Sequence, residues 1–198
     1  MLTFGVMGNI GSGKSTVCRV LSEMGGYIID ADKLGHEIIL RGQPAYDEVL
    51  AEFGVDILLE SGEIDRKKLG AIAFSEIEKI KKLTEITHKY VVQETIKRIK
   101  IITESPGEYK FITIDVPLLF EAGMEKLCDY TFLIRASEEV RIERVINRDN
   151  LSPEDALKRS RSRKDAEEYA GDVSYIITNN GDFKDLREQV KRCVQPLI

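Results

Sequence analysis

The stretch Gly8-Asn9-Ile10-Gly11-Ser12-Gly13-Lys14-Ser15 decides the fold of this chain. It matches G-x-x-x-x-G-K-[ST], the P-loop, whose glycines let the backbone turn so tightly that successive N–H groups surround a phosphate. The helix that begins at about Lys14 directs its positive N-terminal end at the same anion. We expect Lys14 to reach the outer phosphates and the Ser15 hydroxyl to bind Mg²⁺.

The flanking sequence contains the strand and the helix that this motif requires. Residues 2–7 form a short apolar run typical of a buried strand. Residues 15–24 have a helical pattern, with one apolar face made by Val17, Val20, Leu21 and Met24. A glycine-rich turn beside a surface lysine is the alternative, and the order of strand, loop and helix argues against it. The sequence therefore predicts a nucleoside triphosphate site.

The composition is that of one globular unit. The 198 residues are 42% hydrophobic, which is enough for a full core and a small inserted domain. The net charge of −5 argues against non-specific binding of nucleic acid. The three cysteines, Cys18, Cys128 and Cys193, are too few and too far apart for a disulfide framework. His36 and His88 do not have the spacing of zinc ligands.

The sequence also predicts where the protein works. The chain enters its first strand directly, so we expect no signal peptide, and no apolar run is long enough to span a membrane. Few cysteines fit a reduced compartment, so we expect a cytoplasmic protein. We expect a monomer or a weak homo-oligomer that has neither a membrane nor a nucleic acid as its partner.

Four further apolar runs predict strands at residues 27–29, 111–116, 130–134 and 174–177. Helical patterns separate the later runs, among them residues 138–148 and 182–194. Apolar strands that alternate with helices form a parallel sheet with both faces covered. Together with the first strand, these runs predict an α/β P-loop fold of three layers with a five-stranded parallel sheet.

A polar, helix-rich stretch follows the second strand and interrupts this alternation. Its longest helical pattern covers about residues 75–103, and Ser105-Pro106-Gly107 breaks the chain after it. We expect residues 33–106 to form an inserted helical domain that binds the second substrate. The nucleotide-binding core would then consist of residues 1–32 and 107–198.

Three carboxylates stand at the ends of predicted strands. Asp30 and Asp32 follow the second strand, at the edge where ligands bind in open α/β sheets. We expect Asp32 to orient an acceptor hydroxyl and accept its proton, and Asp115 to order Mg²⁺. Capping of a helix or a turn is the alternative for each of them, and it is the preferred reading of Asp30.

Arginines are concentrated between residues 135 and 163, and Arg141, Arg144 and Arg148 recur at helical spacing. Two arginine-bearing helices joined by a short turn predict a lid, residues 144–165, that closes over ATP. Arg144 and Arg148 would neutralise the transferring phosphoryl group. For Arg141 we prefer the alternative, a solvated helix pair with ion pairs to glutamates.

Motifs of other nucleotide-binding classes do not occur. Asn179-Asn180-Gly181-Asp182 lacks the lysine of the guanine-reading pattern N-K-x-D, and Asp115-Val116-Pro117-Leu118 lacks the glycine of the switch motif D-x-x-G. The glycine-rich signature of transporter ATPases is also missing. A short chain with a helical insertion therefore favours a small-molecule kinase.

Three segments together resemble the dephospho-CoA kinases: Gly8 to Thr16, Ile29-Asp30-Ala31-Asp32-Lys33, and Asp115-Val116-Pro117-Leu118-Leu119-Phe120-Glu121. The similarity runs nearly end to end and extends to Arg144-x-x-x-Arg148-Asp149 and Asn179-Asn180-Gly181. The resemblance implies a P-loop core, a helical CoA domain and a lid. It also implies that ATP, with Mg²⁺, phosphorylates the ribose 3′-hydroxyl of dephospho-CoA, the last step of coenzyme A synthesis.

The P-loop motif and the resemblance together assign roles to individual residues. The predicted catalytic set is Asp32, Lys14, Arg144 and Arg148. The implied acceptor contacts are Asp32, His88, Leu118, Phe120 and Glu121. The nucleotide contacts are Gly8, Asn9, Ile10, Gly11, Ser12, Gly13, Lys14, Ser15, Thr16, Asn180 and Gly181, and the metal ligands are Ser15 and Asp115.

Four residues depart from the pattern of the family: Met7, Asn9, Lys89 and Arg163. Met7 and Asn9 replace a threonine and a glycine beside the loop. Because asparagine tolerates left-handed backbone angles better than most residues, we expect the loop to keep its shape. Lys89 replaces the proline after the family's histidine, and Arg163 replaces a glutamine in the lid.

Two alternatives accompany this reading. The first is another P-loop kinase, which would act on a nucleoside monophosphate or a small hydroxy compound. The block at residues 117–121 argues against it. The second is a nucleotide-dependent regulatory module without turnover, and the intact Lys14, Asp32 and lid arginines argue against that one.

Overall fold

The computed structural model describes residues 1–161 and 164–198. The strands are β1 (Thr3–Gly8), β2 (Gly26–Asp30), β3 (Phe111–Asp115), β4 (Tyr130–Arg135) and β5 (Tyr175–Thr178). The α-helices are α1 (Lys14–Glu23), α2 (Ala31–Glu37), α3 (Tyr46–Phe53), α4 (Arg66–Ala73), α5 (Ile77–Glu104), α6 (Glu138–Asp149), α7 (Pro153–Arg161) and α8 (Phe183–Val194). Short 3₁₀ helices are η1 (Val55–Ile57), η2 (Met124–Leu127), η3 (Ala166–Tyr169) and η4 (Gln195–Leu197).

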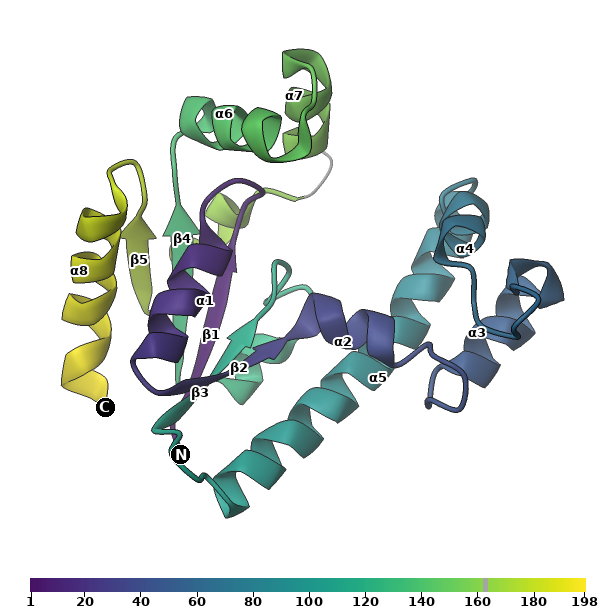
Figure 1. The fold of residues 1–198 in the computed structure, drawn as a ribbon, viewed down its shortest axis with the longest axis horizontal. Helices are drawn as coiled ribbons and strands as arrows, with labels where there is room; N and C mark the ends of the chain where they lie inside the picture. The colour runs from purple at the N-terminus through teal and green to yellow at the C-terminus, as the bar shows by residue number, and fades with distance from the viewer. Residues whose placement is uncertain (162–163) are drawn as a thin grey trace. The chain divides into compact units, whose positions relative to one another are not determined.

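The strands form one sheet in the order β2-β3-β1-β4-β5 (Figure 1). β1 lies at its centre and pairs in parallel with both β3 and β4. In this register Val6 stands beside Asp115, and Gly8 stands beside Ile134. The prediction of a five-stranded parallel sheet in an α/β fold is therefore confirmed.

One face of the sheet is covered by α1 and α8, which pack against each other (Figure 1). Alternate residues of β1, Phe4 and Val6, are fully buried on this face, together with Phe132 of β4. The core cluster there is Phe4, Val6, Val17, Cys18, Val20, Leu21, Phe111, Phe132, Ile134, Ile177, Leu186, Val190 and Val194. Burial of these side chains is the main force that keeps the central strand, and the loop that follows it, in place.

The other face of β1 is covered by the segment around η2. A Cβ atom at Gly5 would lie 2.7 Å from Cys128 Sγ and 2.9 Å from Leu119 Cδ2. A glycine is needed here because those two side chains already fill the space above the strand. The Cys128 thiol donates a hydrogen bond to the carbonyl of Met124, 3.3 Å away.

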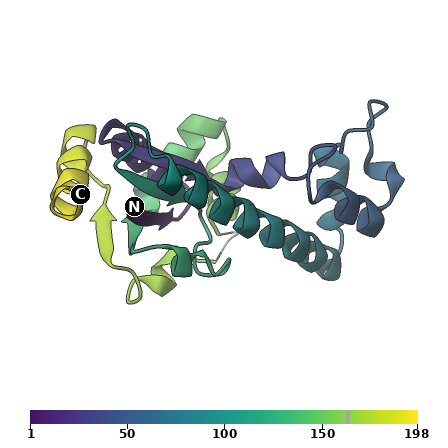
Figure 2. The ribbon, with the colours of Figure 1, turned by 90° about the horizontal axis from the view of Figure 1, so that it is seen from below.

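The chain divides into two compact units, residues 1–29 with 99–198 and residues 30–98. The first contains the sheet, α1, α6, α7 and α8; the second contains α2, α3, α4 and most of α5. Figure 2 shows α5 as a helix without a break. The role of the second unit as an acceptor domain stays a prediction.

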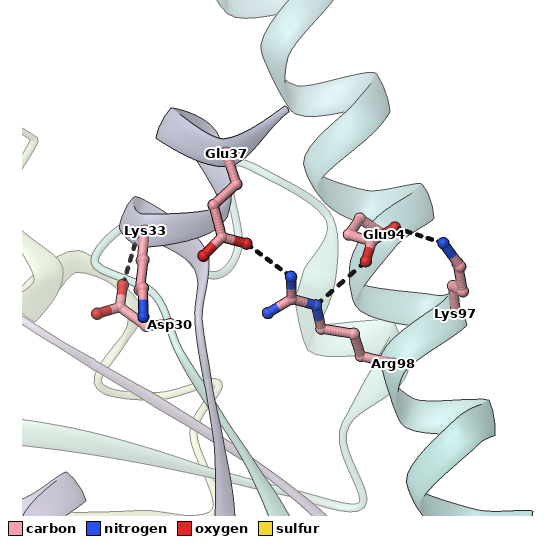
Figure 3. Close-up of polar contacts among 6 residues, drawn as sticks. All are labelled: Asp30, Lys33, Glu37, Glu94, Lys97 and Arg98. Carbon is pink, nitrogen blue, oxygen red and sulfur yellow. Dashed lines mark hydrogen bonds and ion pairs between the residues drawn. The ribbon is translucent and has the colours of Figure 1, made fainter. Parts of the chain in front are cut away.

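Polar contacts connect the helices of the second unit to one another. Arg98 of α5 donates to Glu37 at the end of α2 (Nη2–Oε2 2.6 Å) and to Glu94 one turn away (Nε–Oε1 3.2 Å), as Figure 3 shows. Lys89 forms an ion pair with Glu48 of α3 at 2.7 Å. The lysine that replaces the family's proline therefore has a partner in its own unit.

None of the helices in the described part of the chain is both long enough and apolar enough to cross a membrane. The longest of them, α5, has buried residues only at intervals, Val91 and Thr95. Its remaining surface carries Lys, Arg and Glu side chains in ion pairs three or four residues apart.

Candidate active site

The P-loop connects β1 to α1, as its sequence predicts. Gly11 and Gly13 have φ angles of +82° and +91°, in the left-handed region that side chains rarely adopt. A Cβ at Gly11 would also collide with the backbone carbonyl of Arg141 in α6. Close packing of α6 on the loop therefore requires a glycine at this position.

Ser12, at the middle of the loop, is fully buried. Its carbonyl accepts a hydrogen bond from Asn179 Nδ2 at 2.8 Å. Arg144 Nη1 lies 3.4 Å from the carbonyls of both Gly11 and Ser12, and its Nη2 lies 3.4 Å from Asn179 Oδ1. The structure thus brings Arg144 to the P-loop, 132 residues away in the sequence.

Lys14 forms an ion pair with Asp115, which ends the neighbouring strand β3. Only 8% of Asp115 is exposed, so its negative charge is balanced mainly by this lysine. Ser15 begins the first turn of α1 next to Lys14 and is exposed. The two ends of the motif, lysine and serine, are therefore both held at the carboxyl edge of the sheet.

The described residues include no cluster of three His, Cys, Asp or Glu side chains that could hold a metal. Magnesium in kinases does not need such a cluster, because phosphates and waters supply most of its six oxygens. Ser15 and Asp115 offer a hydroxyl and a carboxylate at the same edge, and these donor types fit Mg²⁺.

Asp30 and Asp32 differ in their surroundings. Asp30 is the N-cap of α2, where Oδ1 accepts from the backbone N–H of Lys33 at 2.9 Å (Figure 3). Asp32 lies in the first turn of that helix and is exposed. The capping alternative therefore describes Asp30, and the Asp32 carboxylate is open to a ligand.

The two predicted lid arginines have different partners. Arg144 faces the P-loop, whereas Arg148 is exposed and makes two hydrogen bonds of 2.8 Å to the carboxylate of Asp149. The bond from Arg148 is the main cause that lowers the pKa of the Asp149 carboxyl. Part of the ion-paired alternative also holds, since Arg161 of α7 pairs with Glu138 at 3.3 Å.

Asn180 fixes the start of α6. Its Oδ1 accepts from the backbone N–H of Ser137 at 2.8 Å, and Ser137 is the N-cap of the helix. Asn180 and Gly181 are both exposed at the end of β5. The segment predicted to contact the nucleotide therefore touches both the P-loop, through Asn179, and the helix that carries Arg144.

The block at 117–121 lies next to the loop. Leu118 is half-buried and lines a small cavity with Gly8 and Ile10 of the P-loop, and Glu121 is exposed. The ring of Phe120 stacks on that of Tyr169, with centroids 4.6 Å apart. Because 49 residues separate the two rings, nothing in the sequence pattern indicated this stacking.

His88 lies in α5, inside the second unit, and is half-buried. Its neighbour Lys89 bonds to Glu48, which also accepts from Tyr90 Oη at 2.6 Å. These contacts lower the pKa of the Glu48 carboxyl, with the lysine bond as the main cause. The structure leaves the assignment of His88 as an acceptor contact a prediction.

Asn9 does not use the left-handed backbone angles that we expected to preserve the loop. In the described ranges Asn150, not Asn9, is the one non-glycine residue with a left-handed φ, of 51°. Asn9 instead uses its side chain, which bonds to Asp165 and to the backbone of Ala166. The substitution is therefore accommodated by hydrogen bonding. Arg163, the other departure near this segment, lies outside the described residues.

Arg141 lies closer to the loop than the sequence indicated. Its Nη1 donates to Ser160 Oγ of α7 at 3.1 Å, and its buried Nε has no partner within the described residues. Its helical spacing from Arg144 was the signal that could have placed it here. A side chain with a buried Nε is not the fully solvated one that we preferred.

Comparison with known proteins shows the family of this chain. The chain matches the family model described as dephospho-CoA kinase over residues 2–185. The dephospho-CoA kinase of Carboxydothermus hydrogenoformans is 42% identical over 191 residues, which cover 96% of this chain and 92% of that protein. The one of Aquifex aeolicus is 40% identical over 197 residues, which cover 100% and 98%. A solved structure, the dephospho-CoA kinase from Campylobacter jejuni, has a TM-score of 0.72 at 29% identity and covers 98% of this chain and 96% of its own. The chain belongs to the dephospho-CoA kinase family.

Proposed function

We propose that this protein transfers the γ-phosphate of ATP to the ribose 3′-hydroxyl of dephospho-CoA and releases CoA and ADP. Membership of the dephospho-CoA kinase family supports the reaction. The observation that carries it is the P-loop with Lys14 paired to Asp115 and Arg144 directed at the loop carbonyls. Two cations at the loop can neutralise the negative charge of a transferring phosphoryl group.

Phosphoryl transfer passes through a loose transition state, so most of the catalysis comes from positioning and charge neutralisation. The P-loop amides and Lys14 would hold the outer phosphates of ATP. Arg144 would meet the charge that builds up on the transferred group. Mg²⁺, held by Ser15 and Asp115, would supply a further positive charge on the phosphates.

Asp32 is our proposed base for the acceptor. Its exposed carboxylate can accept a hydrogen bond from the 3′-hydroxyl and take its proton late in the reaction. We further propose acceptor contacts at His88, Leu118, Phe120 and Glu121, and nucleotide contacts at Asn180 and Gly181. The position of Asn180 beside the P-loop partner Asn179 supports the nucleotide assignment.

We also propose that the protein works in the cytoplasm, as a monomer or a weak homo-oligomer. Its three cysteines are few and far apart in the sequence, as is usual for proteins of a reducing compartment. Size measurement in solution at several concentrations tests the oligomeric state.

The test is a comparison of acceptors. Purified protein with Mg-ATP should turn over dephospho-CoA, whereas AMP, adenosine and shikimate should react slowly or not at all. The Lys14→Ala variant should lose most of this activity, because it lacks the positive charge that binds the β- and γ-phosphates. Good turnover of another acceptor with none of dephospho-CoA would contradict the proposal.

A further inference from the structure

The side chain of Asn9 connects two segments that are far apart in the sequence. Its Nδ2 donates to Asp165 Oδ1 at 2.6 Å, and its Oδ1 accepts from the backbone N–H of Ala166 at 2.9 Å. Donor and acceptor of the carboxamide are both used, and an aspartate at this position would lack the N–H donor. The second residue of the P-loop is thereby tied to the chain that follows the arginine-bearing helices α6 and α7.

The Asp165 carboxylate is well suited to hold this connection. Its Oδ1 also accepts from the backbone N–H of Glu167 at 3.0 Å, which caps η3. The bond from Asn9 is the main cause that lowers the pKa of the Asp165 carboxyl, followed by the Glu167 N–H and the charge of Arg141. Asp165 is therefore ionised near neutral pH, and its bond with Asn9 is charge-assisted.

The connection lies where α6 meets the loop. A cavity of about 240 Å³ opens there, and it is lined by Asn9, Glu138, Arg141, Ser160, Arg161 and Asp165. Arg141 borders it from α6, and the carbonyl of the same residue packs on Gly11. Arg141 lines the same cavity as Asp165, and its positive charge acts on the Asp165 carboxylate. A displacement of Asp165 would therefore change the surroundings of Arg141.

We propose that Asn9 is a positioning residue for phosphoryl transfer, because it fixes Asp165 and Ala166, and with them the arginine-bearing segment, against the P-loop. This inference rests on the proposed kinase function. It differs from a phosphate contact, since Asn9 acts through its side chain on the protein and not on ATP. Catalytic groups must be held to within about half an ångström, and two hydrogen bonds at the loop supply such a constraint.

A charge-swap experiment tests this role. Asn9→Asp keeps the acceptor for Ala166 but sets a second carboxylate against Asp165, so kcat should fall by about tenfold or more. Adding Asp165→Asn restores a donor and an acceptor in reversed order, and kcat should recover most of that loss. The kcat of Asp165→Asn alone should stay close to that of the parent protein, because the Oδ1 of the new asparagine can still accept both hydrogen bonds. The swapped pair has the carboxylate at position 9 that Asn9→Asp has, but the net charge of the parent. A direct effect of the position-9 charge on the phosphates would therefore leave the swapped pair as slow as the single variant.

Two readouts do not depend on turnover. Amide exchange at Ala166 should rise in Asn9→Asp and return in the swapped pair, and the affinity for a non-hydrolysable ATP analogue should change by less than the change in kcat. Lys158→Ala, which removes an exposed pair with Glu154 on α7, is the matched control and should change neither readout.

The possible failures are distinguishable. Absence of dephospho-CoA turnover in the parent protein would refute the proposed function. Amide exchange at Ala166 would still measure whether Asn9 holds Asp165 and Ala166 in place. Unchanged exchange and unchanged kcat in Asn9→Asp, or a swapped pair as slow as Asn9→Asp alone, would overturn the role of Asn9.

Discussion

The charged side chains at the phosphate site make contacts with other protein groups. Lys14 is held by Asp115, and Arg144 lies against loop carbonyls. A buried carboxylate that loses its partner is strongly destabilising, so the pair keeps Lys14 at the loop and not extended into solvent. ATP would then exchange the contacts of Lys14 with the carboxylate for contacts with its phosphates.

The two carboxylates after β2 give the first prediction. Asp32→Asn keeps the size of the side chain and removes the base, so kcat with dephospho-CoA should fall by about 10²–10⁴ with little change in the KM for ATP. Asp30→Ser is the control: serine still caps α2, so activity should stay close to that of the parent. Equal kcat values for Asp32→Asn and the parent would show that Asp32 is not the base and has at most a capping role.

Cys128 gives a prediction on pH. Burial, then the charges of Asp129 and Glu125, raises the pKa of this thiol to about 12. The folded protein should therefore resist alkylation at Cys128 at pH 8, while the chain unfolded in urea reacts readily, as mass spectrometry can measure. Because the folded pKa is the higher one, this group contributes stability below about pH 8.5 that is lost as the pH rises toward 12. Equal alkylation of folded and unfolded protein would contradict the raised pKa.

At the scale of elements, α6 is placed by contacts at several points. Its start is capped by Ser137 and fixed by Asn180, and its first turn packs on Gly11. Farther along, Arg144 reaches the loop carbonyls. A helix located in this way can present its arginines to a bound phosphate from a defined distance.

Close packing of α6 on the loop can be tested with two glycines. Gly11→Ala should cost about 1–2 kcal/mol for the left-handed backbone, plus the collision with the Arg141 carbonyl, and should weaken binding of an ATP analogue. Gly107→Ala has the same kind of backbone, with φ of +56°, but open space around it. It should lower the melting temperature slightly and leave nucleotide affinity unchanged. Similar behaviour of the two variants would show that the contact with α6 is unimportant.

The helices α6 and α7 are expected to respond to nucleotide. Few apolar residues anchor them, Val145 in α6 and Ala156 in α7, so their amides should exchange quickly in the free protein and be protected by an ATP analogue. Arg144→Ala should lower kcat at least as much as it raises KM, because its charge is needed most in the transition state. Identical exchange with and without the analogue, together with full activity of Arg148→Ala, would identify a plain solvated helix pair.

At the scale of the whole molecule, the chain has two compact units, and our proposal gives each a different ligand. An ATP analogue alone should protect amides in and after the P-loop, whereas dephospho-CoA alone should protect amides within residues 30–98. The ATP analogue should leave the amides of residues 30–98 nearly unchanged, whereas dephospho-CoA should also protect the amides of the proposed contacts within residues 117–121. Exchange followed by mass spectrometry can map both. Protection by dephospho-CoA confined to residues 99–198 would contradict the acceptor role of the second unit.

Local patterns in the sequence determined much of the fold. A strand buried on both faces must be apolar along its length, and β1, β3 and β4 are runs of this kind. The P-loop needs glycines where the backbone is left-handed, and Gly11 and Gly13 are found there. These features depend on neighbouring residues alone, so the sequence suffices to predict them.

The partners of individual side chains were decided by the tertiary structure. Asn9 meets Asp165, and Phe120 meets Tyr169, across 156 and 49 positions of the chain. Arg144 and Arg148 are both arginines of α6 and lie one helical turn apart, yet Arg144 faces the loop and Arg148 bonds to its neighbour Asp149. Such pairings arise when strands and helices pack and bring distant residues together, and no local pattern records which residue will be opposite. The sequence by itself therefore determined the strands, the helices and the phosphate-binding loop, and only the packing of those elements decided which side chains hold that loop in place.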